Sequence, residues 1–236
     1  MKALIVIPTY NEIENLPRLI NRLLKLEEDI EILVVDDNSP DGTADWVKTL
    51  SLKNSRIHLL QRAKKMGIGP AYVSGFKWAL MRDYDVIQEM DADLSHRPRY
   101  IPTFLKQIQS YDVVVGSRWM DGGRIANWPA SRILLSRLAN LYAKWVLGVP
   151  ICDLTGGFVC YRREVLENLN LDTLRSDGYS FQIEMKYRAL KNNFRLKEFP
   201  IVFTDRKAGE SKISRQIVIE ALLMVILLKL DRKSVV

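Results

Sequence analysis

The chain contains little cysteine and little histidine. Its 236 residues include two cysteines, Cys152 and Cys160, and two histidines, His58 and His96. Two cysteines do not make a disulfide framework, and no CxxC pair or Cys/His cluster supplies a structural zinc site. Neither histidine has a matching serine or cysteine motif, which disfavours Ser/His/Asp and Cys/His hydrolases. The low cysteine content fits a reducing compartment.

The common glycine motifs of nucleotide-binding proteins are also missing. No Walker A sequence occurs. The segment Gly67–Gly75 departs from the dinucleotide fingerprint, because Tyr72 stands at the third glycine position and no strand directly precedes Gly67. ATP-driven and nicotinamide chemistry are therefore disfavoured. The basic run before this segment is Arg62–Lys65. We expect it to be a solvated loop, and the alternative is that it contacts a phosphate.

No apolar run reaches the roughly 20 residues that a membrane-spanning helix needs. The chain starts directly with an apolar run and no small-residue cleavage site, so we expect no secretory leader. Near the other end, Ile217–Leu228 contains one charged residue, Glu220, and has lysines and arginines on both sides. This pattern fits either a buried core helix or an amphipathic helix in a membrane interface, over residues 211–236.

Positive charge exceeds negative charge in the chain. There are 35 lysines and arginines against 28 acids, which gives a net charge of +7. This balance favours an anionic partner such as nucleic acid, a phosphate-bearing substrate or a lipid surface. Nucleic acid is disfavoured because the cations are scattered and no aromatic-rich RNA motif occurs. With 47% hydrophobic residues and no repeat or flexible linker, we expect one domain over residues 1–236.

Short apolar runs alternate with helical patterns in the first half of the chain. Strands are predicted at Ala3–Ile7, Ile30–Val35, Ile57–Leu60, Val86–Met90 and Val113–Val115. Helices are predicted at Leu16–Leu24, Ala71–Leu80 and Ile101–Ile108, and in the second half at Ser131–Leu147 and Tyr179–Leu190. Two further strands are predicted at Gly157–Tyr161 and Phe199–Phe203. The alternation indicates an α/β fold with a mainly parallel sheet flanked by helices.

Polar segments directly follow four of the predicted strands. Ligands bind beyond the carboxyl ends of the strands in such sheets, so these segments are the expected rim of a site. They are Pro8–Glu12, Asp36–Thr43, Asp91–His96 and Gly116–Arg118.

Two carboxylates, Asp91 and Asp93, stand two residues apart after one predicted strand. Residues with this spacing share a face of a strand, and two like charges so close are costly unless a cation compensates them. Mg²⁺ or Mn²⁺ would complete its shell with phosphate oxygens and water. The alternative is a turn with an aspartate at a helix start, which the following His96-Arg97-Pro98 would suit.

Each of two other polar loops allows two interpretations. Asp36–Thr43 is rich in turn residues and lacks the ligand spacing of an EF-hand, which leaves a plain turn or a loop that reads a base or ribose. In Asp205–Lys212, Arg206 and Lys212 are either surface charges or a pair that binds a phosphate. That loop leads into the apolar C-terminal segment, so a phosphate carried on a lipid would meet the protein there.

Six segments together resemble the dolichyl-phosphate mannose synthases, which are inverting enzymes of glycosyltransferase family 2 with the GT-A fold. The segments are IPTYNEIENL (Ile7–Leu16), VVDDNSPDGT (Val34–Thr43), MDADLSHRP (Met90–Pro98), VVGSRW (Val114–Trp119), DLTGGF (Asp153–Phe158) and DRKAGESK (Asp205–Lys212). The resemblance implies a GT-A fold with a C-terminal apolar helix. It also implies transfer of mannose from GDP-mannose to dolichyl or another polyprenyl phosphate, for glycan assembly, with Mg²⁺ or Mn²⁺ as cofactor. Such an enzyme would be peripheral at the cytoplasmic face of a membrane, and small membrane-embedded partner subunits are compatible with it.

The same resemblance implies roles for individual residues. Those for the nucleotide sugar are Pro8, Tyr10, Glu12, Val35, Asp37, Asp91, Ala92 and Arg118. Those for catalysis, the metal and the acceptor phosphate are Asp93 and Ser95 (metal), Arg118 (sugar phosphate), and Arg206 and Lys212 (acceptor phosphate). Ser95 stands where some relatives carry glutamine, and serine is a weaker ligand. Asp153 and Glu184 are reserve candidates for orienting the sugar or the acceptor.

A different donor or a different function would be compatible with parts of this pattern. The near alternative is a polyprenyl-phosphate glycosyltransferase that uses UDP-glucose or a similar donor. The distant alternative is a non-catalytic nucleotide-binding protein.

Overall fold

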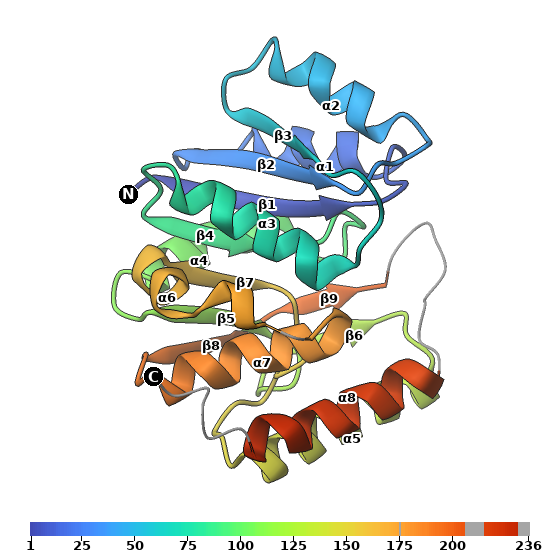
Figure 1. Cartoon of the computed structure of the whole chain (residues 1–236), viewed down its shortest axis with the longest axis vertical. Helices are drawn as coiled ribbons and strands as arrows, with labels where there is room; N and C mark the ends of the chain where they lie inside the picture. Colours follow the sequence, from blue (N-terminus) through green and yellow to red (C-terminus); the bar gives the residue numbers. More distant parts are fainter. Residues whose placement is uncertain (175, 206–214, 231–236) are drawn as a thin grey trace.

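The computed structural model describes residues 1–174, 176–205 and 215–230, and from residue 222 onward the side chains of the last helix. Its core is a seven-stranded sheet in the order β3-β2-β1-β4-β7-β5-β8 (Figure 1). The strands are β1 (Ala3–Thr9), β2 (Ile30–Asp36), β3 (Ile57–Gln61), β4 (Val86–Glu89), β5 (Val113–Ser117), β7 (Val159–Arg162) and β8 (Leu196–Pro200). β7 runs antiparallel to both neighbours and every other pairing is parallel. The expected mainly parallel sheet is confirmed.

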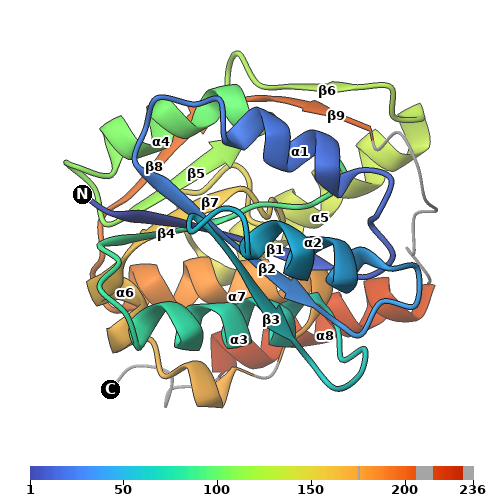
Figure 2. The same ribbon diagram turned by 90° about the horizontal axis from the view of Figure 1, so that it is seen from above.

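Helices cover both faces of this sheet, as Figure 2 shows from above. They are α1 (Leu16–Leu23), α2 (Thr43–Ser51), α3 (Ile68–Leu80), α4 (Ile101–Gln107), α5 (Ala130–Leu147), α6 (Arg163–Asn168), α7 (Gly178–Lys191) and α8 (Arg215–Leu230), with short 3-10 helices at Pro98–Tyr100 and Leu171–Thr173. Apolar side chains of α1, α2 and α4 pack on one face, and those of α3, α6 and α7 pack on the other. Since both faces are covered, the strands are continuous apolar runs.

A third apolar cluster lies beside the sheet, where α5, α7 and α8 pack together. Val225 and Leu228 of α8 are buried there. The predicted C-terminal helix is therefore present, and part of it is core.

One predicted strand is wrong in its extent. Phe199–Phe203 was expected as a single strand, but the chain passes from β8 to β9 (Val202–Thr204) at Ile201. β9 pairs with β6 (Arg124–Ala126) in a separate two-stranded sheet. Pro200, at the end of β8, has no N–H for a continued ladder, which is a physical reason for the break.

The strand order places a switch point between β1 and β4. From β1 the chain proceeds outward to β2 and β3, and it then returns to place β4 on the other side of β1. In open α/β sheets the crevice at such a point, beyond the carboxyl ends of the strands, is where ligands bind. The segments after β1 and β4 are the predicted rims Pro8–Glu12 and Asp91–His96.

Candidate active site

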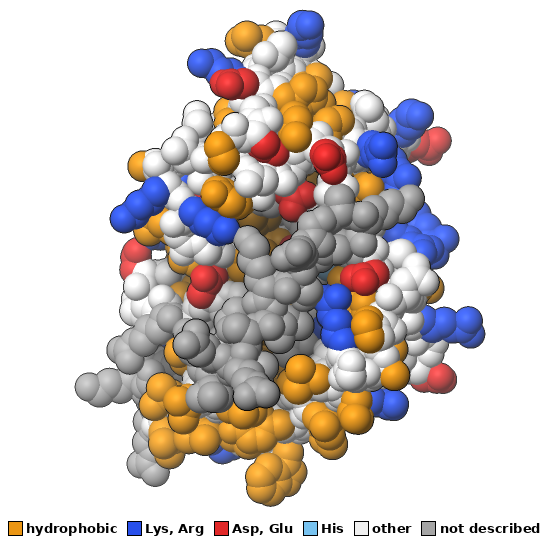
Figure 3. All heavy atoms as spheres, turned by 90° about the vertical axis from the view of Figure 1, so that its right-hand side faces the viewer, with side chains coloured by type: hydrophobic (Ala, Val, Ile, Leu, Met, Phe, Trp, Pro, Cys, Tyr) orange, Lys and Arg blue, Asp and Glu red, His pale blue; other side chains and the backbone are white. Residues whose placement is uncertain are grey.

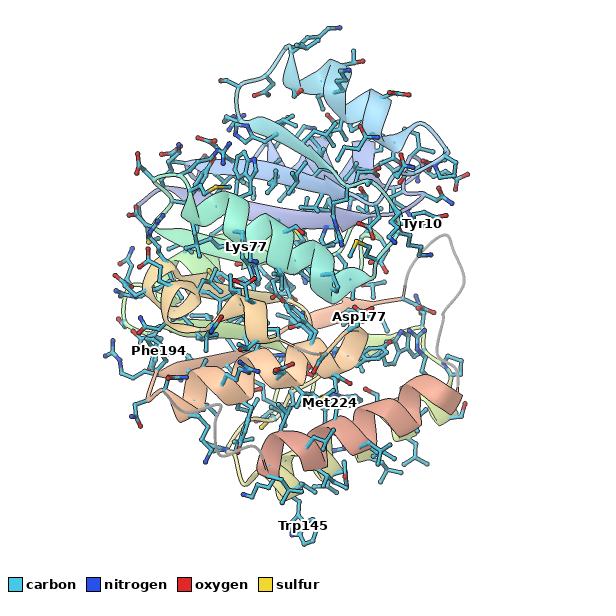
Figure 4. All side chains as sticks on the ribbon, in the orientation of Figure 1. Tyr10, Lys77, Trp145, Asp177, Phe194 and Met224 are labelled. Atoms are coloured by element: carbon cyan, nitrogen blue, oxygen red, sulfur yellow. The ribbon has the colours of Figure 1, made fainter. Side chains whose placement is uncertain are left out.

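A cavity of about 470 Å³ lies at this switch point. One part is formed by segments after β1, β2 and β4 and by the start of α3, and the other by the 155–157 loop and the first turn of α7. Its lining residues are Pro8, Thr9, Tyr10, Glu12, Asp37, Lys65, Gly67, Ile68, Ala71, Asp91, Thr155, Gly157, Asp177, Gly178, Tyr179 and Gln182. Tyr10 and Asp177, from the two parts, lie toward the same side of the molecule (Figure 4).

The residues expected to bind the nucleotide are divided between the cavity and the core. Pro8, Tyr10, Glu12 and Asp37 line the cavity. Val35, in contrast, is fully buried among core side chains and does not line it. Its role at the base stays a prediction.

The two acids that begin the Asp36–Thr43 loop differ in their surroundings. Asp36 accepts hydrogen bonds from the Thr9 hydroxyl and from the amide and hydroxyl of Ser39, so it stabilises the turn. Asp37 faces the cavity, where its two oxygens accept from Arg62 Nη1 at 2.8 Å and from the Met66 amide at 2.9 Å. Asp36 therefore stabilises the turn, whereas Asp37 lines the cavity, and its role at the base or ribose stays a prediction.

The Asp91–His96 segment folds as a tight turn at the end of β4. Leu94 has a φ of 65°, in the left-handed region. Asp93 Oδ1 accepts from the Ser95 amide at 3.0 Å, and Asp91 Oδ1 accepts from the Tyr72 hydroxyl at 3.2 Å. The Asp91 amide donates to His96 Nδ1, and burial lowers the pKa of His96 to about 4, so the imidazole is neutral and can accept. A buried aromatic ring thus fixes the turn that carries both acids.

The donor set of this turn fits a hard divalent cation held in an open site. Asp91 lines the cavity and Asp93 lies two residues away, and both offer carboxylate oxygens. The buried Ser95 Oγ has no hydrogen-bond partner among the described residues, so its oxygen is uncommitted. No group of three or more His, Cys, Asp or Glu side chains suited to a metal occurs in the described parts of the chain. A cation here would complete its shell with phosphate oxygens and water, as Mg²⁺ and Mn²⁺ commonly do. Ala92, between the acids, is buried in the core and does not line the cavity.

Arg118 lies at the end of β5 in a buried ion pair. Its Nε and Nη2 donate to the two oxygens of Asp153 at 2.7 Å each, and Nη2 also donates to Thr155 Oγ1. Burial alone would raise the pKa of the Asp153 carboxyl, but the charge and hydrogen bonds of Arg118 hold it below its usual value. The described geometry therefore gives Arg118 a positioning role for the 153–157 loop. Its predicted contact with the sugar phosphate stays a prediction.

Three more side chains hold the same loop, and two of them, Asn140 and Lys186, are buried. Asn140 of α5 accepts from the amides of residues 154 and 155, and Glu198 of β8 accepts from those of residues 152 and 153. The Lys186 ammonium, on α7, donates to the carbonyls of residues 154 and 156. Burial lowers the pKa of Lys186 to about 8. The loop that lines one wall of the cavity is thus fixed from three elements.

The two parts of the cavity meet where the first turn of α7 touches the start of α3. Asp177 Oδ1 accepts from the Gly69 amide at 2.7 Å. Gly67 has a φ of 103°, and a Cβ there would lie 1.9 Å from Asp177 Oδ2, so this close approach requires glycine. Sequence reasoning missed Asp177, because its partner is 108 positions away and no local motif marks it.

Glu184 is buried and accepts from the amide and hydroxyl of Ser176. It also pairs with Arg188 at 2.5 Å. These contacts are structural, and its role as a reserve candidate stays a prediction. Gln182, two residues before Glu184, lines the cavity and donates to Glu89 at 2.6 Å.

The two predicted acceptor-phosphate residues, Arg206 and Lys212, lie outside the described residues. The residue before them, Asp205, accepts from Trp128 Nε1 at 3.1 Å and from Arg132 Nη1 at 3.2 Å. Arg132 also lies 3.9 Å from the centroid of the Trp128 ring. The start of the predicted acceptor segment is thereby fixed to the beginning of α5.

Solved structures show which fold this is. The chain superposes on glucosyl-3-phosphoglycerate synthase from Mycobacterium tuberculosis, in complex with Mn²⁺, UDP-glucose and phosphoglyceric acid, with a TM-score of 0.70 and 15% identity over 97% of this chain and 79% of that one. It superposes on Staphylococcus aureus TarS with UDP-GlcNAc, with a TM-score of 0.63 and 17% identity over 99% and 68% of the two chains. The chain therefore has the GT-A-type fold of these nucleotide-sugar-binding proteins.

The sequence comparisons define the family. The sequence model of glycosyl transferase family 2 matches residues 4–169, and the chain belongs to this family. It is 45% identical to the undecaprenyl-phosphate mannosyltransferase of Micrococcus luteus, over 95% of this chain and 93% of that one. It is also 45% identical to the polyprenol monophosphomannose synthase of Mycolicibacterium smegmatis, over 95% and 85%. The family resemblance seen in the six sequence segments is confirmed.

Proposed function

We propose that the chain is a polyprenyl-phosphate mannosyltransferase, which moves mannose from GDP-mannose to a polyprenyl phosphate with inversion. The 45% identity over 95% of the chain to two proteins named for such a transfer carries this proposal. Because their names specify undecaprenyl phosphate and polyprenol, we take polyprenyl phosphate as the acceptor class, in which dolichyl phosphate is one member.

A phosphomonoester acceptor reacts without a catalytic base. A phosphomonoester has its second pKa near about 6, so its oxygen is largely ionised at neutral pH. The nucleophile needs no proton removed, and the chain's task is to bring two anionic substrates together. Asp37 and Tyr10 line the cavity and are proposed to bind the nucleoside, and the 153–157 loop, which forms one wall, is proposed to meet the sugar.

Asp91 and Asp93 would hold Mg²⁺ or Mn²⁺ at the donor diphosphate. The bound cation would supply Lewis acidity for the departing diphosphate. The rigid turn, with His96 on the Asp91 amide and the Ser95 amide on Asp93, keeps both carboxylates oriented. Arg206 and Lys212 are proposed to bind the acceptor phosphate by charge-assisted hydrogen bonds.

An exposed apolar face on α5 and α8 supports a lipid-borne acceptor. Hydrophobic side chains gather at the lower end of the molecule in Figure 3, and Trp145 projects outward in Figure 4. Exposed members of this face are Leu134, Leu135, Leu138, Leu141, Trp145, Leu222, Leu223, Ile226, Leu227 and Leu230. The two helices are joined by a hydrogen bond from the Tyr142 hydroxyl to the Leu222 carbonyl. We name this surface the α5–α8 face.

The charges on the α5–α8 face favour a membrane surface as its partner. α5 contains Arg132, Arg137 and Lys144 and no acid. Basic side chains beside an apolar stripe suit the headgroups and acyl boundary of an anionic bilayer. No helix in the described parts of the chain has the length and hydropathy to cross a membrane. From the apolar side chains and the basic residues of the α5–α8 face, we propose peripheral attachment through both helices, at the cytoplasmic face of a membrane, whereas the sequence alone indicated only the C-terminal helix.

Charge introduced into the α5–α8 face should weaken liposome binding. We expect Leu138→Glu with Trp145→Glu to lower partitioning onto anionic vesicles by roughly tenfold or more, because two exposed apolar side chains leave the lipid boundary. Vesicle co-sedimentation measures this. Leu52→Glu is the matched control, since Leu52 is 84% exposed just past the end of α2, at the opposite end of the molecule. An equal effect of both variants, or no effect of either, would contradict membrane attachment by this face.

Donor and acceptor profiling with purified protein tests the proposed reaction. We expect transfer from GDP-mannose to a polyprenyl phosphate, with product of inverted configuration, to exceed transfer from UDP-glucose. If the protein preferred UDP-glucose, UDP-glucose would replace GDP-mannose as the proposed donor. Nucleotide binding without transfer to any polyprenyl phosphate would favour the non-catalytic alternative.

A further inference from the structure

The side chain of Lys65 covers the ring expected to meet the base. Its Nζ lies 3.9 Å from the centroid of the Tyr10 ring, and both residues line the cavity. Lys65 is an exposed residue and forms no ion pair with the described part of the chain. Its ammonium group is thus held at the cavity by a cation–π contact, which is worth only about 0.5–1 kcal/mol at an exposed site.

Lys65 is the one cationic side chain among the described residues that line the cavity, against four carboxylates, those of Glu12, Asp37, Asp91 and Asp177. A nucleoside diphosphate adds further negative charge to this space. Anions so placed repel unless cations compensate them. The cavity therefore needs positive charge from its own wall in addition to any metal ion.

The backbone on both sides of Lys65 is fixed while its side chain is not. Arg62 Nη1 and the Met66 amide donate to the two oxygens of Asp37. Arg62 stands three positions before Lys65, and Met66 follows Lys65 directly. Asp37 therefore keeps the Lys65 backbone at the cavity, and the flexible four-carbon stem leaves the ammonium free to change partners.

We propose that Lys65 binds the donor diphosphate, and that it occupies the face of Tyr10 until the nucleobase replaces it there. This assignment rests on the proposed function for the identity of the donor. When the nucleotide binds, its base stacks on the Tyr10 ring. The Lys65 ammonium group then leaves the ring and forms a charge-assisted hydrogen bond with a phosphate oxygen. The weak contact with the ring is thereby exchanged for a stronger one.

Calorimetric titration of Lys65→Met with GDP and with guanosine tests this exchange. Methionine keeps an apolar stem and removes the charge. We expect GDP to bind about tenfold or more weakly than to the wild type, because one charge-assisted hydrogen bond is lost. We expect guanosine to bind as well as before or a few-fold tighter, because the base no longer displaces a cation from the ring.

Lys64→Met is the matched control, since Lys64 is an exposed neighbour that does not line the cavity. Equal weakening of guanosine and GDP in Lys65→Met would assign Lys65 to the base and overturn the proposal. Equal weakening of GDP binding by both variants would mean that the loss comes from the overall positive charge of the loop, which would also overturn the proposal.

The same titrations with UDP and uridine test the identity of the donor separately from the role of Lys65. Wild-type binding of UDP alone would refute the proposed donor, yet a diphosphate-specific loss in Lys65→Met would still support Lys65. Binding of neither nucleotide would refute both.

Discussion

Asp93→Ala is expected to lower kcat for sugar transfer by about a thousandfold or more. The carboxylate is the proposed direct ligand of the cation at the donor diphosphate, and a Lewis-acid contact of that kind is worth several kcal/mol in the transition state. The measurement is transfer from GDP-mannose to a polyprenyl phosphate with Mg²⁺ or Mn²⁺. Near-normal activity would remove the metal role from Asp93.

A conservative variant separates the charge of Asp93 from its place in the turn. Asp93→Asn retains an oxygen that can accept from the Ser95 amide, so the turn should persist while cation binding is lost. We expect nearly the same loss of activity as in Asp93→Ala, together with loss of Mn²⁺ binding measured by calorimetry. Asp83→Ala, at an exposed acid after α3, should change neither quantity. Activity in Asp93→Asn close to that of the wild type would mean that the acid shapes the turn only.

Arg118→Leu is expected to lower the free energy of unfolding by about 3–5 kcal/mol. Asp153 is fully buried, and removal of the guanidinium leaves its carboxylate without the two charge-assisted hydrogen bonds that compensate its burial. Urea denaturation of purified protein measures this. The 153–157 loop should also lose its fixed position, so residual folded protein should transfer sugar poorly.

Removing the charges of both Arg118 and Asp153 shows whether the loss of stability in Arg118→Leu comes from an unpaired buried charge or from lost packing. We expect the double variant Arg118→Leu/Asp153→Leu to recover a substantial part of the stability, because no buried charge is left uncompensated. Lys77→Ala breaks the exposed pair with Asp172 and should cost at most about 1 kcal/mol (Figure 4 labels Lys77). If Arg118→Leu were no more destabilising than Lys77→Ala, the ion pair would not hold the loop.

The strands of the first half and the acids behind them could be predicted from the sequence, because each signal is local. An apolar run such as Ala3–Ile7 must be buried on both faces, and polar residues after it must lie at the carboxyl edge of a parallel sheet. Asp37 and Asp91 reach the cavity as that rule requires. The side chain of Val35 lies in the core, as the alternation of a strand requires, and its expected role at the base stays a prediction.

The parts that could not be predicted depend on contacts between distant segments. The Arg118–Asp153 pair joins residues 35 positions apart, and neither sequence neighbourhood reveals it. The sequence predicts the helix α5, but only its packing against α7 and α8 shows which of its apolar side chains remain exposed. The sequence predicts a solvated loop at Arg62–Lys65, because only the fold brings Lys65 over the Tyr10 ring.

The direction of β7 decides which loops of the second half belong to the site. A parallel strand delivers the segment that follows it to the catalytic edge, whereas an antiparallel one delivers the segment that precedes it. The loop ahead of β7 is therefore the cavity wall, and the residues after Arg162 emerge at the opposite edge of the sheet. Extra residues in the β7–α6 connection would lie away from the cavity, whereas an insertion between Pro150 and Phe158 would alter the cavity wall. Among related chains, length variation should accordingly concentrate on the far side of this one strand.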